Sequence, residues 1–171
     1  MKEPVFPRPE TVEKKAKERP SVVLRLATVS DAEVVCALNQ KMKDVRTYSA
    51  MDDLEEQREE LEKTVTYLIE KDAKVVGYVS YEIKSEGHAY LSSLVIDPEF
   101  QRQGIGREAL TNVLRELETT ERIDLTVHPE NSVALQLYLS LGFQIESRGE
   151  DYYGDGEPRL VLVRVNKVQG R

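Results

Sequence analysis

The sequence predicts a mixed α/β domain built on a central sheet, and three observations support this fold class. Short runs rich in Val, Ile, Thr and Tyr follow one another in the middle of the chain with brief connections, as antiparallel hairpins do. Two amphipathic helical patterns come next, and one lies between two strand-like runs in the order that joins parallel strands. No internal repeat is present. We therefore expect a mostly antiparallel sheet with one parallel central pair and helices on both faces.

The first half of the domain is expected to hold a strand, two helices and an antiparallel meander. Each helix is preceded by a capping-box signature, in which a Ser or Asp stands three positions before a Glu. The later strand-like runs are separated by connections of three or four residues, which favours hairpins. The predicted elements are a strand at 21–27, a helix from Ser30 (with Glu33) to about Met42, a helix from Asp52 (with Glu55) to about Lys63, and strands at 64–70, 74–83 and 88–96.

The second half changes to helices that alternate with strands. Both helical patterns carry one apolar stripe at helical spacing, which predicts packing on a sheet. The second of them is followed by a glycine in a suitable C-cap position. The predicted elements are a helix at about 105–118, a strand at 122–128, a helix from about Asn131 to Gly142, and two final strands at 143–148 and 159–165.

The domain is expected to span residues 21–167. Residues 1–20 contain four prolines and a run of Lys and Glu with few apolar residues, which predicts a flexible or docked N-terminal arm. Residues 168–171 are expected to be a short tail. A chain of 171 residues suits one domain with a well-buried core.

Composition argues against several functional classes. The net charge is −7, so a broad basic surface for nucleic acid is not expected. No apolar run approaches the ~20 residues that span a bilayer, and no signal-peptide pattern opens the chain, so we expect no membrane partner. The single cysteine, Cys36, suits a reducing cytoplasm, which is the expected location. Together with His88 and His128 it gives no metal-ligand spacing, and we expect no metal.

A glycine-containing segment at 101–110 predicts a phosphate-binding loop. Gly104 and Gly106 fit the pattern G-x-G-x-x-A, which is a weak dinucleotide fingerprint. A doubly wound sheet, however, cannot be assembled from hairpins followed by a single strand–helix unit. The glycines instead let the backbone of a helix N-terminus approach a pyrophosphate, with charge added by Arg102 and Arg107 and no help from a metal.

Two motifs resemble the GNAT superfamily of N-acyltransferases. The acyl-CoA signature of that family reads Q/R-x-x-G-x-G/A, and a second signature reads N-x-x-A-x-x-L-Y-x-x-x-G-F. The resemblance implies a GNAT fold over about residues 22–165, with acetyl-CoA as co-substrate and no metal. It also implies acetyl transfer to a primary amine by direct attack in a ternary complex. The matching residues are Gln101, Gly104 and Gly106 in the first motif, and Asn131, Ala134, Leu137, Tyr138, Gly142 and Phe143 in the second.

The resemblance also implies which residues contact acetyl-CoA. The pantetheine arm is expected to lie along the backbone of one strand, where an amide near Val95 or Ile96 would polarise the thioester carbonyl. Core packing of the same apolar side chains is compatible with this role. Asn131 has two alternatives, a contact to CoA or a helix N-cap. The implied CoA-binding residues are Leu94, Val95, Ile96, Arg102, Gln103, Gly104, Ile105, Gly106, Arg107 and Asn131.

The catalytic groups are less clearly defined by the resemblance. It implies that Tyr138 protonates the leaving thiolate, whereas a purely structural role would make it a buried tyrosine. Relatives that acetylate protein N-termini often carry Glu or His where this chain has Thr126, which cannot act as a base near neutral pH. His128 and Tyr90 are candidate catalytic residues, with a capping or surface histidine and a packing tyrosine as alternatives. Glu82 is a further candidate.

The acceptor amine is predicted from the segment 149–158 and from amine chemistry. This segment resembles the tyrosine-bearing hairpin that borders the peptide site of N-terminal acetyltransferases, so Tyr152 and Tyr153 are expected to bind a peptide backbone; an ordinary hairpin turn is the alternative. At pH 7, deprotonating a lysine costs about 4.6 kcal/mol but an α-amine only about 1.1 kcal/mol. An N-terminal amine therefore needs less help from the enzyme.

Three functions follow from these arguments. The leading expectation is an N-acetyltransferase for a peptide or protein N-terminus. The first alternative is an N-acetyltransferase for a small amine such as a polyamine, amino sugar or amino acid. The second is a non-catalytic acyl-CoA-binding regulatory module. A monomer and a homodimer are both compatible with the sequence.

Overall fold

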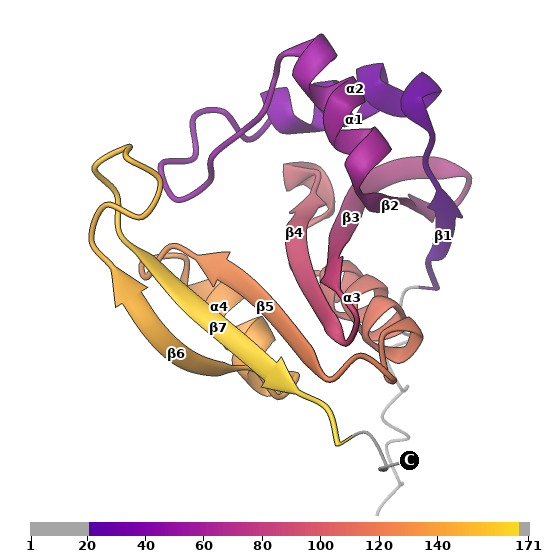
Figure 1. The fold of residues 1–171 in the computed structure, drawn as a ribbon. Helices are drawn as coiled ribbons and strands as arrows, with labels where there is room; N and C mark the ends of the chain where they lie inside the picture. Colours follow the sequence, from indigo (N-terminus) through magenta and orange to yellow (C-terminus); the bar gives the residue numbers. More distant parts are fainter. Residues whose placement is uncertain (1–20, 168–171) are drawn as a thin grey trace, which may run out of the picture.

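The computed structural model describes residues 21–167, and the predicted arm and tail lie outside this range (Figure 1). A seven-stranded sheet forms the centre, and four α-helices pack against it. The elements are β1 (Val23–Leu26), α1 (Ala32–Gln40), α2 (Leu54–Lys63), β2 (Val65–Lys71), β3 (Lys74–Ser85), β4 (His88–Ile96), α3 (Ile105–Glu116), β5 (Arg122–Val127), α4 (Ser132–Ser140), β6 (Gln144–Gly149) and β7 (Arg159–Val165).

The sheet has the order β1-β2-β3-β4-β5-β7-β6. Every neighbouring pair is antiparallel except β4 and β5, which run parallel because α3 forms the crossover between them. The predicted fold class, a mostly antiparallel sheet with one parallel central pair, is therefore confirmed. The meander of β2, β3 and β4 and the hairpin of β6 and β7 also agree with the expected order.

The parallel pair separates along its length, and this separation creates the site. Strands β4 and β5 are paired only where 88–90 faces 122–124. Beyond Tyr90, β4 stays bonded to β3 as far as Ile96 but no longer pairs with β5. Figure 1 shows the two halves of the sheet diverging from this point. The backbone edge of residues 91–96 is consequently not paired with a strand on the side that faces β5, and Ile96 O accepts from Gln101 Nε2 at 3.0 Å.

Helices cover both faces of the sheet. On one face α3 and α4 pack over the main core, and on the other α1 packs over a smaller cluster. The buried residues of α3 recur at helical spacing and form one apolar stripe. This stripe explains which side of α3 packs on the sheet. The largest fully buried side chains are Leu68, Ile69, Ile105, Leu110, Ile123, Leu125, Leu162, His128, Val35, Val76, Val79 and Val95.

Both predicted capping boxes are displaced. Ser30 lies inside a short 3-10 helix at Val29–Asp31, and Thr28 takes the cap position, where its N–H donates to Asp31 Oδ2 at 2.9 Å. Before α2 the cap is Asp53 and not Asp52, with its carboxylate accepting two backbone N–H groups of the first turn. In each case a neighbouring residue with the same chemistry lies in better geometry. Within residues 21–167, no helix has the length and apolar character needed to cross a bilayer.

Candidate active site

The glycine loop forms the N-terminus of α3, as the sequence predicts. Gly104 is the N-cap residue, with φ of +81° in the left-handed region, which favours glycine. The first intrahelical bond runs from Glu108 N to Gly104 O at 3.0 Å. The N–H groups of the first turn, residues 105–107, therefore have no helical partner and are available to an anion.

The neighbours of this loop place it beside the free edge of β4. A Cβ atom on Gly106 would lie 3.6 Å from Ile96 and 3.9 Å from Leu137. The N-terminus of α3 thus lies between α4 and the C-terminal end of β4. Arg107 donates to Ser140 Oγ at 2.8 Å, which ties α3 to α4. The loop can therefore hold a pyrophosphate at one end of an arm that runs along β4.

The backbone of Leu94, Val95 and Ile96 meets the geometric requirement for that arm. Its edge toward β3 is occupied by sheet pairing, and its edge toward β5 has no strand partner. Val95 is 1% exposed, and its side chain packs in the smaller core cluster. Gly77 faces Ile96 across the ladder, and a Cβ on it would lie only 2.3 Å from Val95 O. Glycine at this position is required for the close approach of β3 and β4.

A cavity of about 430 Å³ lies at the opening between β4 and β5. Leu94 and Ser93 of β4, Thr126 of β5 and residues of α4 line it, and the segment 47–49 borders it from the α1 and α2 side. The residues of the glycine loop do not line this central cavity. Residues of α4, which packs beside α3, contribute to its lining.

Tyr138 of α4 reaches the central cavity from the α3 and α4 side. Its side chain is 8% exposed and packs edge-on against Phe143, with ring centroids 5.8 Å apart. Burial raises the pKa of Tyr138 to about 12, so the phenol stays protonated throughout the physiological range. The geometry presents a neutral O–H donor at the sheet opening.

Asn131 caps α4. Its Oδ1 accepts from Ala134 N at 3.2 Å, so the structural alternative for this residue is observed. Asn131 also lines the central cavity, and among residues 21–167 its amide nitrogen has no hydrogen-bond partner. The two alternatives are compatible, and the contact to CoA remains a prediction.

Three hydroxyl groups of the central cavity lining lie close together. Tyr90 lies 3.1 Å from Thr126 Oγ1 and 3.2 Å from the hydroxyl of Tyr153, and Thr126 lies 2.5 Å from that same hydroxyl. Burial raises the pKa of Tyr90. This hydroxyl cluster of Tyr90, Thr126 and Tyr153 occupies the position where the sequence comparison expected a carboxylate or imidazole. It supplies hydrogen-bond donors and acceptors but no base of ordinary strength at neutral pH.

The two loop tyrosines have different surroundings. Tyr153 borders the central cavity, and its ring lies beneath the guanidinium of Arg159 at 5.4 Å. Tyr152 lines only a second cavity of about 380 Å³, next to His88 and Asp124. Of the two residues predicted for acceptor binding, Tyr153 lines the central cavity, and Tyr152 lines the second cavity beside it.

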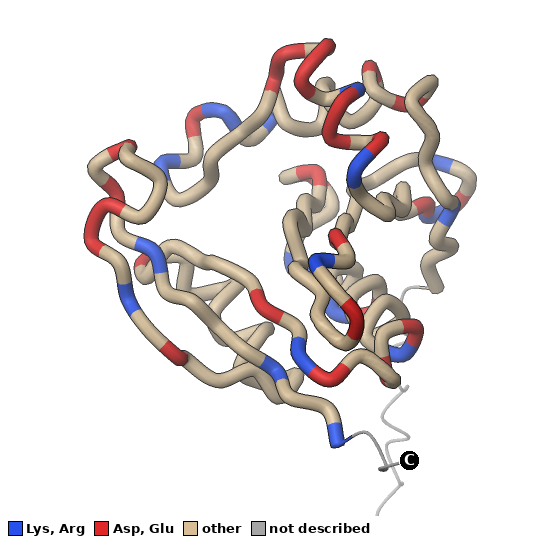
Figure 2. Tube along the Cα trace, in the orientation of Figure 1, with Lys and Arg blue, Asp and Glu red and all other residues tan. Residues whose placement is uncertain are grey.

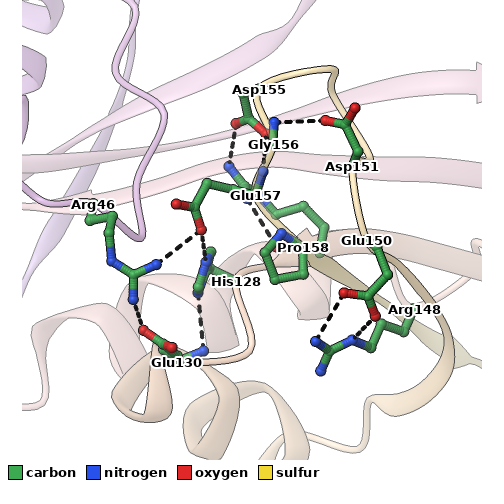
Figure 3. Close-up of polar contacts among 11 residues, drawn as sticks. Arg46, His128, Glu130, Arg148, Glu150, Asp151, Asp155, Gly156, Glu157 and Pro158 are labelled. Carbon is green, nitrogen blue, oxygen red and sulfur yellow. Dashed lines mark hydrogen bonds and ion pairs between the residues drawn. The ribbon is translucent and has the colours of Figure 1, made fainter.

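His128 is buried, with 2% exposure, and both of its ring nitrogens are engaged (Figure 3). Nδ1 accepts from Glu130 N at 3.1 Å, so the proton lies on Nε2, which donates to Glu157 at 2.8 Å. In this geometry no lone pair of the ring is free for an incoming amine. Glu82, the other candidate base, is paired with Lys84 at 2.9 Å.

An unexpected contact joins the two loops that border the central cavity (Figure 3). Arg46, from the segment between α1 and α2, pairs with Glu157 of the β6–β7 loop at 3.0 Å and also with Glu130. The sequence carried no signal for this bridge, because the partners are more than eighty residues apart. The bridge therefore links two loops that each contribute residues to the cavity lining.

A buried polar network holds the α1–α2 segment against the sheet. The hydroxyl of Tyr78 donates to Asn39 Oδ1 at 2.7 Å, and Tyr48 reaches the same oxygen at 3.1 Å. Asn39 in turn donates to Met51 O and to Gln57. Burial raises the pKa of both tyrosines, so they remain neutral. Sequence reasoning missed this network, although Asn39 stands among apolar residues of α1.

Comparison with known proteins agrees with this geometry. Residues 32–143 match the profile of the acetyltransferase (GNAT) family. The chain belongs to this family. It is therefore an acetyltransferase, and the prediction of an enzyme is confirmed; acetyl-CoA is the co-substrate that this family uses.

Several GNAT proteins are similar in sequence or structure. The [ribosomal protein bS18]-alanine N-acetyltransferase of Escherichia coli K12 is 30% identical over 106 residues, which cover 60% of this chain and 71% of that protein. The crystal structure of the ribosomal-protein-S18-alanine N-acetyltransferase from Escherichia coli has a TM-score of 0.76 at 22% identity, covering 88% of this chain and 97% of that one. A ribosomal L7/L12 alpha-N-protein acetyltransferase in complex with coenzyme A has a TM-score of 0.73 at 18% identity, covering 86% and 96%.

No metal is suggested by the geometry of the described part of the chain. Among residues 21–167, no group of three or more His, Cys, Asp or Glu side chains is arranged to hold an ion. The donor groups at the glycine loop are backbone N–H groups and arginines, which suit a pyrophosphate directly.

Proposed function

We propose that this GNAT enzyme transfers an acetyl group from acetyl-CoA to the α-amine of a peptide or protein. The observation that carries the proposal is the position of Tyr153, which the β6–β7 loop brings to the sheet opening beside Tyr90 and Thr126. Hydroxyl groups in this position can bind the amides of an extended peptide whose N-terminus points at β4. The names of the relatives in Escherichia coli support a protein acceptor.

The lack of a strong base in the cavity also favours an α-amine. Thr126 cannot accept a proton near pH 7, and the ring of His128 is fully engaged. An α-amine with an ordinary pKa near 7.8 loses its proton at pH 7 for about 1.1 kcal/mol, whereas a lysine requires about 4.6 kcal/mol. A hydroxyl cluster can orient the neutral amine while water accepts the proton. This arrangement suffices for an α-amine, whereas a lysine needs a stronger base.

The residues of this chain have separate tasks in the proposed transfer. The first-turn N–H groups of α3 and the side chains of Arg102 and Arg107 hold the pyrophosphate. The free edge of β4 from Leu94 to Ile96 aligns the pantetheine arm, and one of its N–H groups polarises the thioester carbonyl. The amine attacks that carbon, the C–S bond breaks, and the thiolate leaves. Tyr138, neutral and buried, donates its hydrogen bond to the sulfur as negative charge develops there.

A small primary amine is the second candidate acceptor, and one observation favours it. The bridge from Arg46 to Glu157 and Glu130 links the two loops that border the cavity, which limits the room for a peptide between them. A cavity of about 430 Å³ is large enough for a polyamine or an amino sugar. The peptide proposal requires that this exposed bridge open, at a cost that is small for surface ion pairs.

The test is acetylation by purified protein of three acceptor classes: peptides with free N-termini, N-blocked peptides with one lysine, and polyamines. Thiol release and product mass are measured together, and Tyr138→Phe is the control for enzyme-dependent transfer. Acetylation of free N-termini that is lost in the variant supports the proposal. Acetylation of polyamines alone would replace the peptide with the small amine as acceptor.

A further inference from the structure

The central cavity continues beneath α2 over an unusually polar part of the sheet. Thr66, Ser80 and Ser92 lie on β2, β3 and β4, and all three line the cavity. Thr66 faces Ser80 in the ladder, and Ser80 Oγ lies 3.0 Å from Ser92 Oγ. Thr66 and Ser80 are each 3% exposed. A sheet face covered by a helix is normally apolar, so this hydroxyl row does not serve packing.

Glu60 closes the far end of the hydroxyl row. It lies on α2 three residues after Gln57, so both side chains are on the same helix face, and both line the cavity. Glu60 is half-buried, and its carboxylate has no hydrogen-bond or ion-pair partner among residues 21–167. A half-buried carboxylate without a partner loses hydration for no compensating contact. Its placement therefore indicates a ligand that supplies the missing partner.

The other carboxylates around the two cavities differ from Glu60 because each of them already has a cationic or imidazole partner. Figure 2 shows that acidic residues are concentrated on α2 and on the β6–β7 loop, the two segments that border the acceptor side. Only a carboxylate without a partner can bind an incoming cation without first giving up an existing ion pair. The paired ones are Glu82 with Lys84, Asp124 with His88, Glu130 with Arg46, and Glu157 with His128 and Arg46.

The position of Glu60 decides which cation it can receive. The hydroxyl row crosses two strand spacings from β4 to β2, roughly 10 Å. Glu60 stands at the β2 end, where its carbonyl accepts from Thr64 N at 3.0 Å. It is therefore too far from the sheet opening to receive the reacting amine itself. A second cationic group of the same acceptor, about 10 Å from the reacting amine, can reach it along the hydroxyls.

We propose that Glu60 and the hydroxyl row form a subsite for a second cationic group of the acceptor. This inference rests on the proposed function and deepens it, because it names the acceptors that the enzyme prefers. These are peptides with a basic side chain within the first two residues. The hydroxyls of Thr66, Ser80 and Ser92 accept hydrogen bonds from the cation, and the carboxylate of Glu60 neutralises its charge.

The test compares peptides that differ only in the charge of one side chain. Arginine or citrulline, which have nearly the same shape, is placed at the first, second or eighth position of one peptide with a free N-terminus. The kcat/KM of N-terminal acetylation is measured for the wild type, for Glu60→Gln and for Glu62→Gln. Glu62 is exposed on the same helix and does not line the cavity, so it is the matched control for net charge.

We expect the wild type and Glu62→Gln to prefer arginine over citrulline by about tenfold or more at the first or second position. In Glu60→Gln this preference should fall below about twofold, with a melting temperature no lower than that of the wild type and with the rates for the citrulline peptides retained. At the eighth position all three proteins should show less than about twofold preference, since long-range attraction is screened.

Two results would overturn the inference in distinguishable ways. Acetylation of the peptides with the same arginine-to-citrulline ratio in the wild type and Glu60→Gln would refute the subsite and leave the proposed function intact. Acetylation of no peptide at all would refute the proposed function, and the subsite would fall with it.

Discussion

Replacing Gly104 by alanine tests whether the conformation of the loop, and not glycine content alone, serves acetyl-CoA. Gly104 has φ of +81°, and a Cβ built on it meets no atom within 4 Å. The penalty is therefore conformational and not steric. A non-glycine residue in the left-handed region costs about 1–2 kcal/mol. Alanine also lowers the conformational entropy of the unfolded state, which stabilises the fold by about 0.4–1 kcal/mol. The expected net loss is about 1 kcal/mol.

Gly106→Ala is the matched control. The same substitution two residues later should raise the stability of the fold, whereas Gly104→Ala should lower it. Gly106 has no positive φ, and its added Cβ would make ordinary contacts of 3.6–3.9 Å. Alanine in the first turn of α3 should stabilise the fold by about 0.5–1 kcal/mol. The two variants should differ by several degrees in melting temperature, since about 1 kcal/mol shifts it by roughly 2–4 °C in a chain of this size.

Acetyl-CoA affinity, measured by isothermal titration calorimetry, should separate the variants further. Alanine at Gly104 relaxes the cap and turns the first-turn N–H groups away from the pyrophosphate. Loss of one charge-assisted hydrogen bond weakens binding about tenfold. Gly106→Ala should keep affinity within about threefold of the wild type. Equal losses in both variants, or an unchanged affinity in Gly104→Ala, would refute the assignment of the loop.

Three further predictions concern the central cavity. Tyr138→Phe should lower kcat by about 10²–10³ with acetyl-CoA affinity unchanged, measured by thiol release, because only the transition state gains its hydrogen bond; a loss below fivefold would make it a packing residue. Asn131→Ala should cost about 1 kcal/mol in urea unfolding through the lost cap, and an unchanged stability would contradict the observed hydrogen bond. The pairing with His128 and Arg46 holds the pKa of Glu157 below its usual value. The ionised carboxylate of Glu157 therefore contributes fully to stability above about pH 4.3, and this contribution is lost as the pH falls further. The melting temperature of Glu157→Gln should consequently fall less between about pH 5 and 3 than that of the wild type.

Much of the fold could be predicted from the sequence because its signals are local. The predicted bounds of the strands at 88–96 and 159–165 coincide with those of β4 and β7, since runs rich in apolar and β-branched residues between polar segments are a local signal. The second helix was predicted to end near Lys63, as it does. The caps were displaced because Thr28 and Asp53 compete with the neighbouring Ser30 and Asp52, and only backbone geometry selects between them.

The site divides in the same way. The sequence alone determined the acyltransferase class, the glycine loop at the start of α3 and the tyrosine of α4, because these motifs are contiguous and each residue type has a local reason for its place. Tertiary structure alone decided that His128 is fully hydrogen-bonded, that Tyr153 and not Tyr152 reaches the cavity, that Arg46 bridges two loops, and that Glu60 stands alone at the end of a hydroxyl row. Each of these depends on contacts between segments far apart in the chain, where no local pattern specifies which side chain finds a partner and which is left for a ligand.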